Sequence, residues 1–216
     1  MHHLEFVTQK TARVVTSAPL QGIYDYLLVA LHGQGHLAPY FIKQFEPIMN
    51  GNLLVVVPEA QSRYYLNGYS GRVGATWMTK EQRLVDIKDY VLYLESLMNE
   101  IEQKVEIKKS RTLFGFSQGA ATASRLLNER NLGFDNLTLW AGVFPPDLHF
   151  EGQTFPNELK TQVVMGTKDE FVNETRLAEN LLMIKGMEVN PELIRFEGGH
   201  EIPKEELIKW WAALSA

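Results

Sequence analysis

Residues 112–129, with the sequence TLFGFSQGAATASRLLNE, decide how the chain folds. The run TLFGF is apolar without alternating polar positions, which is typical of a strand buried on both faces. The segment that begins at Gln118 has a helical pattern. Between the two, Gly115 and Gly119 stand two residues before and two residues after Ser117. This arrangement predicts a buried strand that turns sharply into a helix, because glycine fits where backbones pass close together.

Short apolar runs of the same kind recur along the chain, and segments of helical period separate them. Such runs indicate parallel strands whose two faces are both covered by helices. The alternation predicts an α/β fold, a three-layer α/β/α domain with a mostly parallel central sheet. We expect strands at residues 26–31, 53–57, 112–116, 137–140, 162–165 and 193–196, and helices at residues 39–48, 80–104, 118–129, 173–185 and 203–214.

The N-terminal region has a different pattern. Residues 4–7 and 12–16 alternate between apolar and polar side chains and flank a polar stretch. They predict an antiparallel N-terminal hairpin that opens the sheet at one edge. No Pro/Ser-rich linker, charge block or internal repeat divides the chain, so we expect a single domain over residues 1–216.

The amino-acid composition excludes several classes of function. The formal net charge is −5, Lys and Arg are scattered, and there is no cysteine. This balance excludes a basic surface for nucleic acid and favours a small-molecule substrate. Thiolate metal sites are excluded, and His2 and His3 have no third ligand nearby, so we expect no metal site. No apolar run reaches about 18 residues and the N-terminus lacks a secretory signal, so we expect a cytoplasmic location without stable membrane insertion.

Ser117 is the candidate nucleophile. In a G-x-S-x-G turn from strand to helix the serine is exposed, and the N-terminal N–H groups of the helix favour a developing negative charge. A serine hydroxyl also needs a histidine base and a carboxylate that orients the histidine. Downstream of Ser117 the chain has His149, in a loop, and His200, directly after an expected strand. The strand-end position favours His200 as the base.

Asp169 is the candidate carboxylate. It follows the strand expected at residues 162–165 and precedes His200, which gives the chain order Ser, Asp, His. The less favoured alternatives lie in other loops or beside it, and they are Asp135, Asp147 and Glu170.

The oxyanion hole requires two backbone N–H groups about 3 Å from the oxygen that becomes negative. Gln118, directly after the serine, supplies one. The loop LHGQG at residues 31–35 follows an early strand, and the N–H of Gln34 is its natural donor. We expect His32 to hold this loop by hydrogen bonding rather than to act as a second base.

Substrate-binding side chains should come from residues close to the same loops. Each of them could instead be a residue of the hydrophobic core. For Trp77 and Phe144 the sequence favours the substrate-binding role and the core role equally. Residues 63–74 contain three tyrosines and several glycines, and they predict either a mobile loop over the site or a plain surface loop. The expected pocket residues are Leu37, Trp77, Met78, Phe144, Phe171 and Val172.

These motifs together resemble the phospholipase/carboxylesterase family, which includes bacterial carboxylesterases and acyl-protein thioesterases. The resemblance implies the α/β-hydrolase fold and no cofactor, with Ser117, Asp169 and His200 as the triad and Gln34 and Gln118 as oxyanion donors. The matching segments run from about residue 26 to the C-terminus and are LHGQG (31–35), Val57-Pro58, the Trp77 segment, GFSQG (115–119), AGVFP (141–145), residues 166–169 and residues 199–202.

Two positions depart from the family pattern. His36 stands where family members often have an acidic residue, and Val172-Asn173 stands where Val-Pro is common. We expect a serine carboxylesterase that forms an acyl-enzyme on Ser117 and acts on a small ester. A thioester or a lysophospholipid as substrate stays open, as do a serine peptidase or amidase and a non-catalytic ligand-binding protein of the same fold. The sequence also leaves open whether two chains pair as a homodimer.

Overall fold

The computed structural model describes residues 2–148, 159–172, 174–185 and 189–216. Its strands are β1 (Val14–Thr16), β2 (Gly22–Leu31), β3 (Leu53–Pro58), β4 (Ser62–Tyr65), β5 (Val73–Thr76), β6 (Val105–Phe116), β7 (Asn136–Trp140), β8 (Lys160–Gly166) and β9 (Glu192–Phe196). Its helices are α1 (Ala38–Phe41), the 3-10 helix η1 (Ile42–Ile48), α2 (Arg83–Lys104), α3 (Gln118–Glu129), α4 (Glu174–Lys185) and α5 (Lys204–Leu214).

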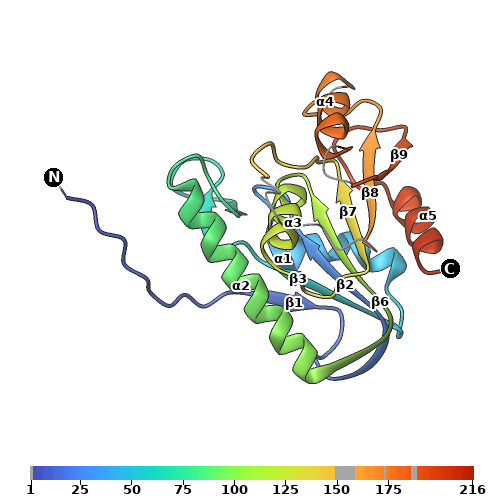
Figure 1. Cartoon of the computed structure of the whole chain (residues 1–216). Helices are drawn as coiled ribbons and strands as arrows, with labels where there is room; N and C mark the ends of the chain where they lie inside the picture. The colour runs from blue at the N-terminus through green and yellow to red at the C-terminus, as the bar shows by residue number, and fades with distance from the viewer. Residues whose placement is uncertain (1, 149–158, 173, 186–188) are drawn as a thin grey trace.

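A seven-stranded sheet forms the centre of the molecule, in the order β1-β3-β2-β6-β7-β8-β9 (Figure 1). Every neighbouring pair in it is parallel except β1 with β3. Helices α2, α3 and α4 cover one face, and α1, η1 and α5 cover the other. The predicted α/β fold with a mostly parallel sheet in three layers is therefore confirmed.

The apolar runs lack alternation because both faces of each central strand are buried. In β2, Leu27, Val29 and Leu31 pack under α2 and α3, whereas Leu28 and Ala30 pack under α1 and α5. All five side chains are buried. Successive residues of a strand point to opposite faces, so a sheet covered on both sides requires an apolar residue at every position.

The antiparallel N-terminal edge is present, but its pairing differs from the expected hairpin. Strand β1 pairs with β3, with Val15 opposite Val57. Residues 4–7 belong to no strand, and Leu4, Phe6 and Val7 are exposed. The N-terminal segment extends away from the body of the molecule (Figure 1), where it has neither a strand edge nor an apolar surface to hold it.

Two other segments differ locally from the sequence expectation. The helix expected at residues 39–48 is one short α-helical turn followed by the 3-10 helix η1, which contains Pro47. Proline lacks the N–H that an α-helix needs at that position. Residues 63–74, expected to be a loop, form most of the antiparallel hairpin of β4 and β5, with Tyr65 opposite Val73.

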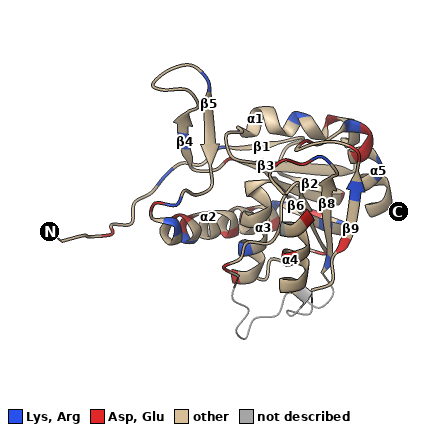
Figure 2. Ribbon diagram, turned by 90° about the horizontal axis from the view of Figure 1, so that it is seen from above, with Lys and Arg blue, Asp and Glu red and all other residues tan. Residues whose placement is uncertain are grey.

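Charged side chains of both signs occur along the outer helices. Figure 2 shows Lys and Arg interspersed with Asp and Glu along α2 and α5. None of the helices that the structure describes has both the length and the apolar character needed to cross a membrane.

Glu59, directly after β3, is the one buried carboxylate that ties the N-terminal elements together. Its side chain is fully buried and accepts hydrogen bonds from Arg13, from Arg63 (2.6 Å) and from the N–H of Ala38 (3.0 Å). Burial by itself would raise the pKa of Glu59, but the hydrogen bonds from Arg13, Arg63 and Ala38 bring that pKa below its usual value of 4.5. The charged form is therefore the one that the fold stabilises.

Replacing Glu59 with Gln should lower the free energy of unfolding at neutral pH by about 1.5–3 kcal/mol, the usual contribution of hydrogen bonds to a charged group. Because the pKa of Glu59 is lower in the folded state, this contribution is complete above the unfolded pKa and is lost as the pH falls through the folded value. Urea unfolding of wild type and E59Q should therefore show a difference that shrinks below about pH 4.5.

The matched control is E106Q, since Glu106 is exposed on β6. It should change stability little at any pH. A wild-type advantage over E59Q that stayed constant into the acid range would contradict the role given to the Glu59 charge.

Candidate active site

Ser117 lies at the turn between β6 and α3, in a backbone conformation that is rare for a residue with a side chain. Its φ is 54° and its ψ is −116°. Its N–H donates to the carbonyl of Trp140 on β7 (2.9 Å), which fixes the strand end to the neighbouring strand. Such a conformation costs of the order of 1–3 kcal/mol and persists only when the surroundings hold it. The turn projects the serine hydroxyl above the end of the sheet.

The two flanking glycines allow the backbone to pass through this turn. A Cβ atom on Gly119 would lie 2.1 Å from the carbonyl oxygen of Leu31, at the end of β2. A Cβ atom on Gly115 would lie 2.4 Å from the carbonyl oxygen of Gly119. No larger residue fits at either position, so the first turn of α3 rests directly on the end of β2.

The structure brings Ser117, His200 and Asp169 into one hydrogen-bonded row. His200 Nε2 lies 2.9 Å from Ser117 Oγ, and His200 Nδ1 lies 2.9 Å from Asp169 Oδ2. The other carboxylate oxygen of Asp169 accepts the N–H groups of Phe171 (2.8 Å) and Val172 (3.1 Å). An ionised carboxylate only accepts, so Nδ1 carries the imidazole proton and Nε2 is free to accept the serine proton.

The loops that carry Asp169 and His200 are attached to each other by backbone contacts. The N–H of Lys168 donates to the carbonyl of Gly198 (2.8 Å). A Cβ atom on Gly166 would lie 2.4 Å from the carbonyl oxygen of Gly199. The carboxylate and the imidazole therefore keep a fixed separation, because their supporting backbones are in direct contact.

The other candidate carboxylates, Asp135 and Asp147, have different partners. Asp135 accepts the N–H of Arg111 (2.8 Å), at the start of β7 and so at the opposite end of the sheet from the serine. Asp147 is paired with two arginines. His149 lies outside the described residues.

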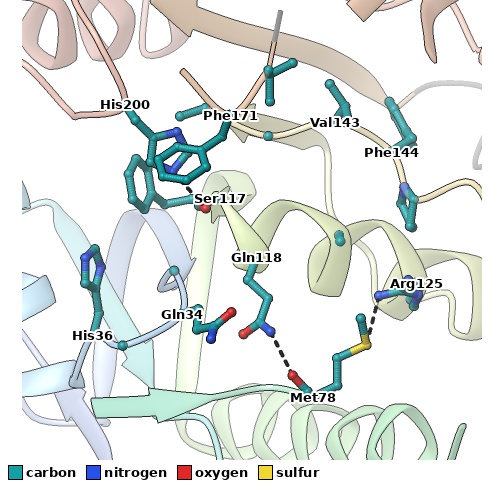
Figure 3. A pocket seen from close by; sticks show the side chains of 18 of the residues that line it. Gln34, His36, Met78, Ser117, Gln118, Arg125, Val143, Phe144, Phe171 and His200 are labelled. Carbon is teal, nitrogen blue, oxygen red and sulfur yellow. Dashed lines mark hydrogen bonds between the residues drawn. The ribbon is translucent and has the colours of Figure 1, made fainter. Parts of the chain in front are cut away.

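The N–H groups of Gln34 and Gln118 make no hydrogen bond to another described residue. Gln118 is the first residue of α3, whose N–H has no partner within the helix. The Gln34 loop is held against β5, because the N–H of Gly35 donates to the carbonyl of Ala75 (2.8 Å) and the N–H of Ala75 to the carbonyl of His36 (3.1 Å). Both donors lie beside Ser117 at the same end of the sheet (Figure 3).

His32 holds the loop from inside, as expected. It is fully buried, and its Nε2 accepts the N–H of Ala60 (3.0 Å) while Nδ1 lies 2.8 Å from the carbonyl of Gly33. Burial lowers the pKa of His32 to about 4. A neutral ring with both nitrogens in use positions the loop and has no free nitrogen for proton transfer.

The side chain of Gln118 makes hydrogen bonds of its own. Its Oε1 accepts the N–H of Trp77 (3.0 Å), and its Nε2 donates to the carbonyl of Met78 (2.9 Å). It thereby attaches the segment after β5 to the start of α3 (Figure 3). The amide of Gln118 therefore fixes one wall of the site.

A cavity of about 680 Å³ opens beside Ser117. Of the predicted pocket residues, the structure places Met78, Phe144, Phe171 and Val172 on its wall. Other parts of the wall come from Gly33, Gln34, His36, Tyr64, Leu66, Phe116, Ala121 and Val143.

Trp77 and Leu37 are not part of this wall. Trp77 is 3% exposed, packs against His32 and donates its indole N–H to the carbonyl of His32 (2.9 Å). Its neighbour Met78 lines the cavity, and the carbonyl of Met78 accepts from the amide of Gln118. Leu37 precedes α1 and lines a separate cavity of about 590 Å³.

The cavity wall also has three charged residues that the sequence did not predict to lie together: Arg83, Arg125 and Asp147. Arg125 donates to Asp147 through Nη2 (2.7 Å) and Nε (3.2 Å), and Arg83 Nη1 lies 3.2 Å from the same carboxylate. One signal was available, because Arg125 follows Ser117 by two four-residue steps and so lies on the same face of α3. Arg83 and Asp147 give no comparable signal. Among the described residues, no three His, Asp or Glu side chains gather as metal ligands would.

Comparison with known proteins gives a family and a fold. A family model described as serine hydrolase (FSH1) matches residues 55–210. No curated protein matches the chain. Similar solved structures include esterase PE8 (18% identity, 95% of this chain and 99% of that chain, TM-score 0.72) and Zea mays acyl-protein thioesterase 2 (20%, 94% and 99%, 0.69). A phospholipase/carboxylesterase from Dyadobacter fermentans DSM 18053 is also similar (18%, 97% and 99%, 0.71). The α/β-hydrolase fold is thereby confirmed.

Replacing Gly119 with Ala should destabilise the protein, since the new methyl group would meet the carbonyl of Leu31 at 2.1 Å. Overpacking of this kind costs about 1–3 kcal/mol, and here the obstacle is backbone. Chemical denaturation should show the loss as a lower midpoint. G51A is the control, because a Cβ on Gly51 has nothing within 4 Å. Equal midpoints for G119A and G51A would contradict the close approach of α3 to β2.

Proposed function

We propose that this chain, which belongs to the FSH1 family of serine hydrolases, hydrolyses carboxylic esters through an acyl-enzyme on Ser117. The observation that carries the proposal is the row from Ser117 through His200 to Asp169, with 2.9 Å at each of its two hydrogen bonds. The cavity beside the serine supports it, because an acyl group needs an apolar space next to the nucleophile.

The first step is attack by Ser117 Oγ on the ester carbonyl. His200 Nε2 takes the hydroxyl proton as the new C–O bond forms, and Asp169 stabilises the resulting imidazolium. The proton then passes from Nε2 to the leaving alcohol as the old C–O bond breaks, which leaves the acyl group on Ser117. Water then attacks the acyl carbonyl while His200 Nε2 takes a proton from the water. The bond between the acyl carbon and Ser117 Oγ breaks, Oγ receives the proton from Nε2, and the carboxylic acid leaves.

The oxygen of the tetrahedral intermediate would lie between the N–H groups of Gln34 and Gln118. A donor of this kind contributes about 2.7–4 kcal/mol to the transition state in a comparable hydrolase. Since neither N–H has another partner among the described residues, both are available without breaking a bond. The turn at Ser117 supports the same role, because α3 begins at the next residue and leaves the N–H of Gln118 without a partner in the helix.

Alcohol, thiol and amine leaving groups all fit the proposed mechanism. The structures similar to this chain include an esterase and an acyl-protein thioesterase, and both kinds of substrate pass through the same acyl-enzyme. An amide would do so too, with a poorer leaving group. A set of one acyl group joined to p-nitrophenol, to a thiol and to p-nitroaniline separates esterase, thioesterase and amidase activity by their relative kcat/KM.

Replacing Ser117 with Ala should abolish the burst of p-nitrophenol and the covalent labelling by a fluorophosphonate probe, because no acyl acceptor remains. The control is S96A, which removes an exposed hydroxyl bonded within α2. S96A should keep both signals at the wild-type level. A wild-type protein that is folded but unlabelled would instead favour a non-catalytic ligand-binding protein.

Replacing Asp169 with Asn should lower kcat by about 10⁴ while substrate binding changes little, as in the comparable protease. The Asn side chain can still accept the N–H groups of Phe171 and Val172, so the loop keeps its shape. It cannot hold a proton on His200 Nδ1 as a carboxylate does. Steady-state kinetics with a p-nitrophenyl ester measures the effect, and a kcat within tenfold of wild type would remove Asp169 from the triad.

A further inference from the structure

The cavity beside Ser117 has a charged end that the proposed reaction does not use. Arg83, Arg125 and Asp147 line it, and Arg125 is almost completely buried, with 6% of its side chain exposed. The side chains of Asp147 and Arg83 are 23% and 37% exposed. The rest of the wall near them is apolar and includes Phe144 and Ala121.

This end of the cavity carries an excess positive charge. Asp147 is the only acidic residue among the described residues of the wall, and it faces two arginines. Burial alone would raise the pKa of Asp147, but hydrogen bonds from Arg125 lower that pKa below its usual value. Asp147 is therefore ionised at neutral pH and cancels one of the two guanidinium charges. One positive charge is left over.

The arginines also have hydrogen-bond donors to spare. Of its five N–H groups, Arg125 uses Nε and Nη2 on Asp147, and its Nη1 lies against the sulfur of Met78 at 3.5 Å, a weak acceptor (Figure 3). The hydroxyl of Tyr90 also interacts with this guanidinium. Arg83 gives only Nη1 to Asp147. Ion-pairing with Asp147 holds both guanidinium groups in place before any ligand arrives, which reduces the cost of ordering them on binding.

The charged end lies in line with the nucleophile. Ser117, Ala121 and Arg125 follow one another at four-residue spacing along one face of α3, and all three line the cavity. Eight residues of helix span about 12 Å. A helical side chain leans toward the N-terminus of its helix, so the Arg125 head lies on the Ser117 side of its own Cα.

From this arrangement, and resting on the proposed esterase function, we propose that the cavity selects acyl groups that end in a carboxylate. The ester carbonyl would lie at Ser117, the methylene chain along Ala121 and Phe144, and the terminal carboxylate at Arg83 and Arg125. The substrates would be half-esters or half-thioesters of short dicarboxylic acids. Arg83 and Arg125 are then specificity-determining residues and take no part in the proton transfers.

The test compares p-nitrophenyl half-esters of dicarboxylic acids with p-nitrophenyl esters of monocarboxylic acids of equal chain length, in a series of increasing length. Wild type should prefer the charged ester by at least about tenfold in kcat/KM, which corresponds to about 1.4 kcal/mol. The preference should reside in KM, should peak at one chain length and should fall with added salt.

Substitution of Arg83 separates charge recognition from structure. R83Q should lower kcat/KM for the half-ester about tenfold and leave the neutral ester unchanged, and R83E should discriminate against the half-ester. R130Q is the matched control, because Arg130 is 33% exposed and is paired with Glu95 on the surface, away from the cavity. R130Q should behave as wild type toward both esters.

The outcomes distinguish the two proposals. Efficient cleavage of neutral esters without preference for the charged ones would overturn the carboxylate site and leave the esterase assignment standing. Equal losses on both esters in R83Q would also overturn it, since that pattern indicates a structural role. If no ester is cleaved and a fluorophosphonate does not label Ser117, the proposed function itself fails. Binding of a dicarboxylate to S117A, measured by calorimetry against the monocarboxylate of equal length, then tests the carboxylate site without turnover, and equal affinities would overturn it.

Discussion

The close approach of the first turn of α3 to the end of β2 is the contact on which the site depends. At Gly119 the separation leaves no room for a Cβ atom beside the carbonyl of Leu31. Strands β2 and β6 are neighbours, with Leu31 opposite Gly115, so the loop after β2 begins level with the turn after β6. For that reason the N–H groups of Gln34 and Gln118 come to the same place as the hydroxyl of Ser117. One steric constraint thus positions the candidate nucleophile and both candidate oxyanion donors together.

Pairing in the sheet offsets the conformational free energy of the strained turn at Ser117. Ser117 has a φ of 54°, which a residue with a side chain adopts only when its surroundings require it. Strand β6 is paired on both sides along its apolar end, and the pairing continues past the strand through the N–H of Ser117. The hydrogen bonds of buried Glu59 also stabilise the region beyond β2, because they link the end of β3 to β4 and to α1. The strained turn is held by interactions that do not themselves take part in the chemistry.

The sequence predicted the parts of the molecule that repeat a local pattern. Apolar runs identified six strands of the main sheet. In the central strands these runs follow from burial on both faces, whereas the edge strand β9 is mostly exposed. The strand-end positions of Ser117, Asp169 and His200 were also predictable, since parallel strands deliver their carboxyl ends to one edge. Directions of single side chains were not predictable. Trp77 and Met78 are adjacent in the chain, yet only Met78 faces the cavity, and this depends on how the segment after β5 is attached to Gln118. The hairpin of β4 and β5 was missed because its exposed tyrosines and its glycines resemble a loop.

The arginines of the cavity illustrate a different limit. Arg83 begins α2, Arg125 lies in α3 and Asp147 follows β7, so no sequence spacing connects the three. The charges of these three residues should have little effect on the rate of the reaction at Ser117. The side chain of Arg83 is 37% exposed, so solvent screens its interaction with an oxyanion at the other end of the cavity. A carboxylate in direct contact with the same arginines gains from hydrogen bonds as well as from charge. In the two proposals, one helix therefore carries two separate tasks: the N-terminus of α3 would serve the reacting carbonyl, and the Arg125 turn would serve the far end of the acyl group.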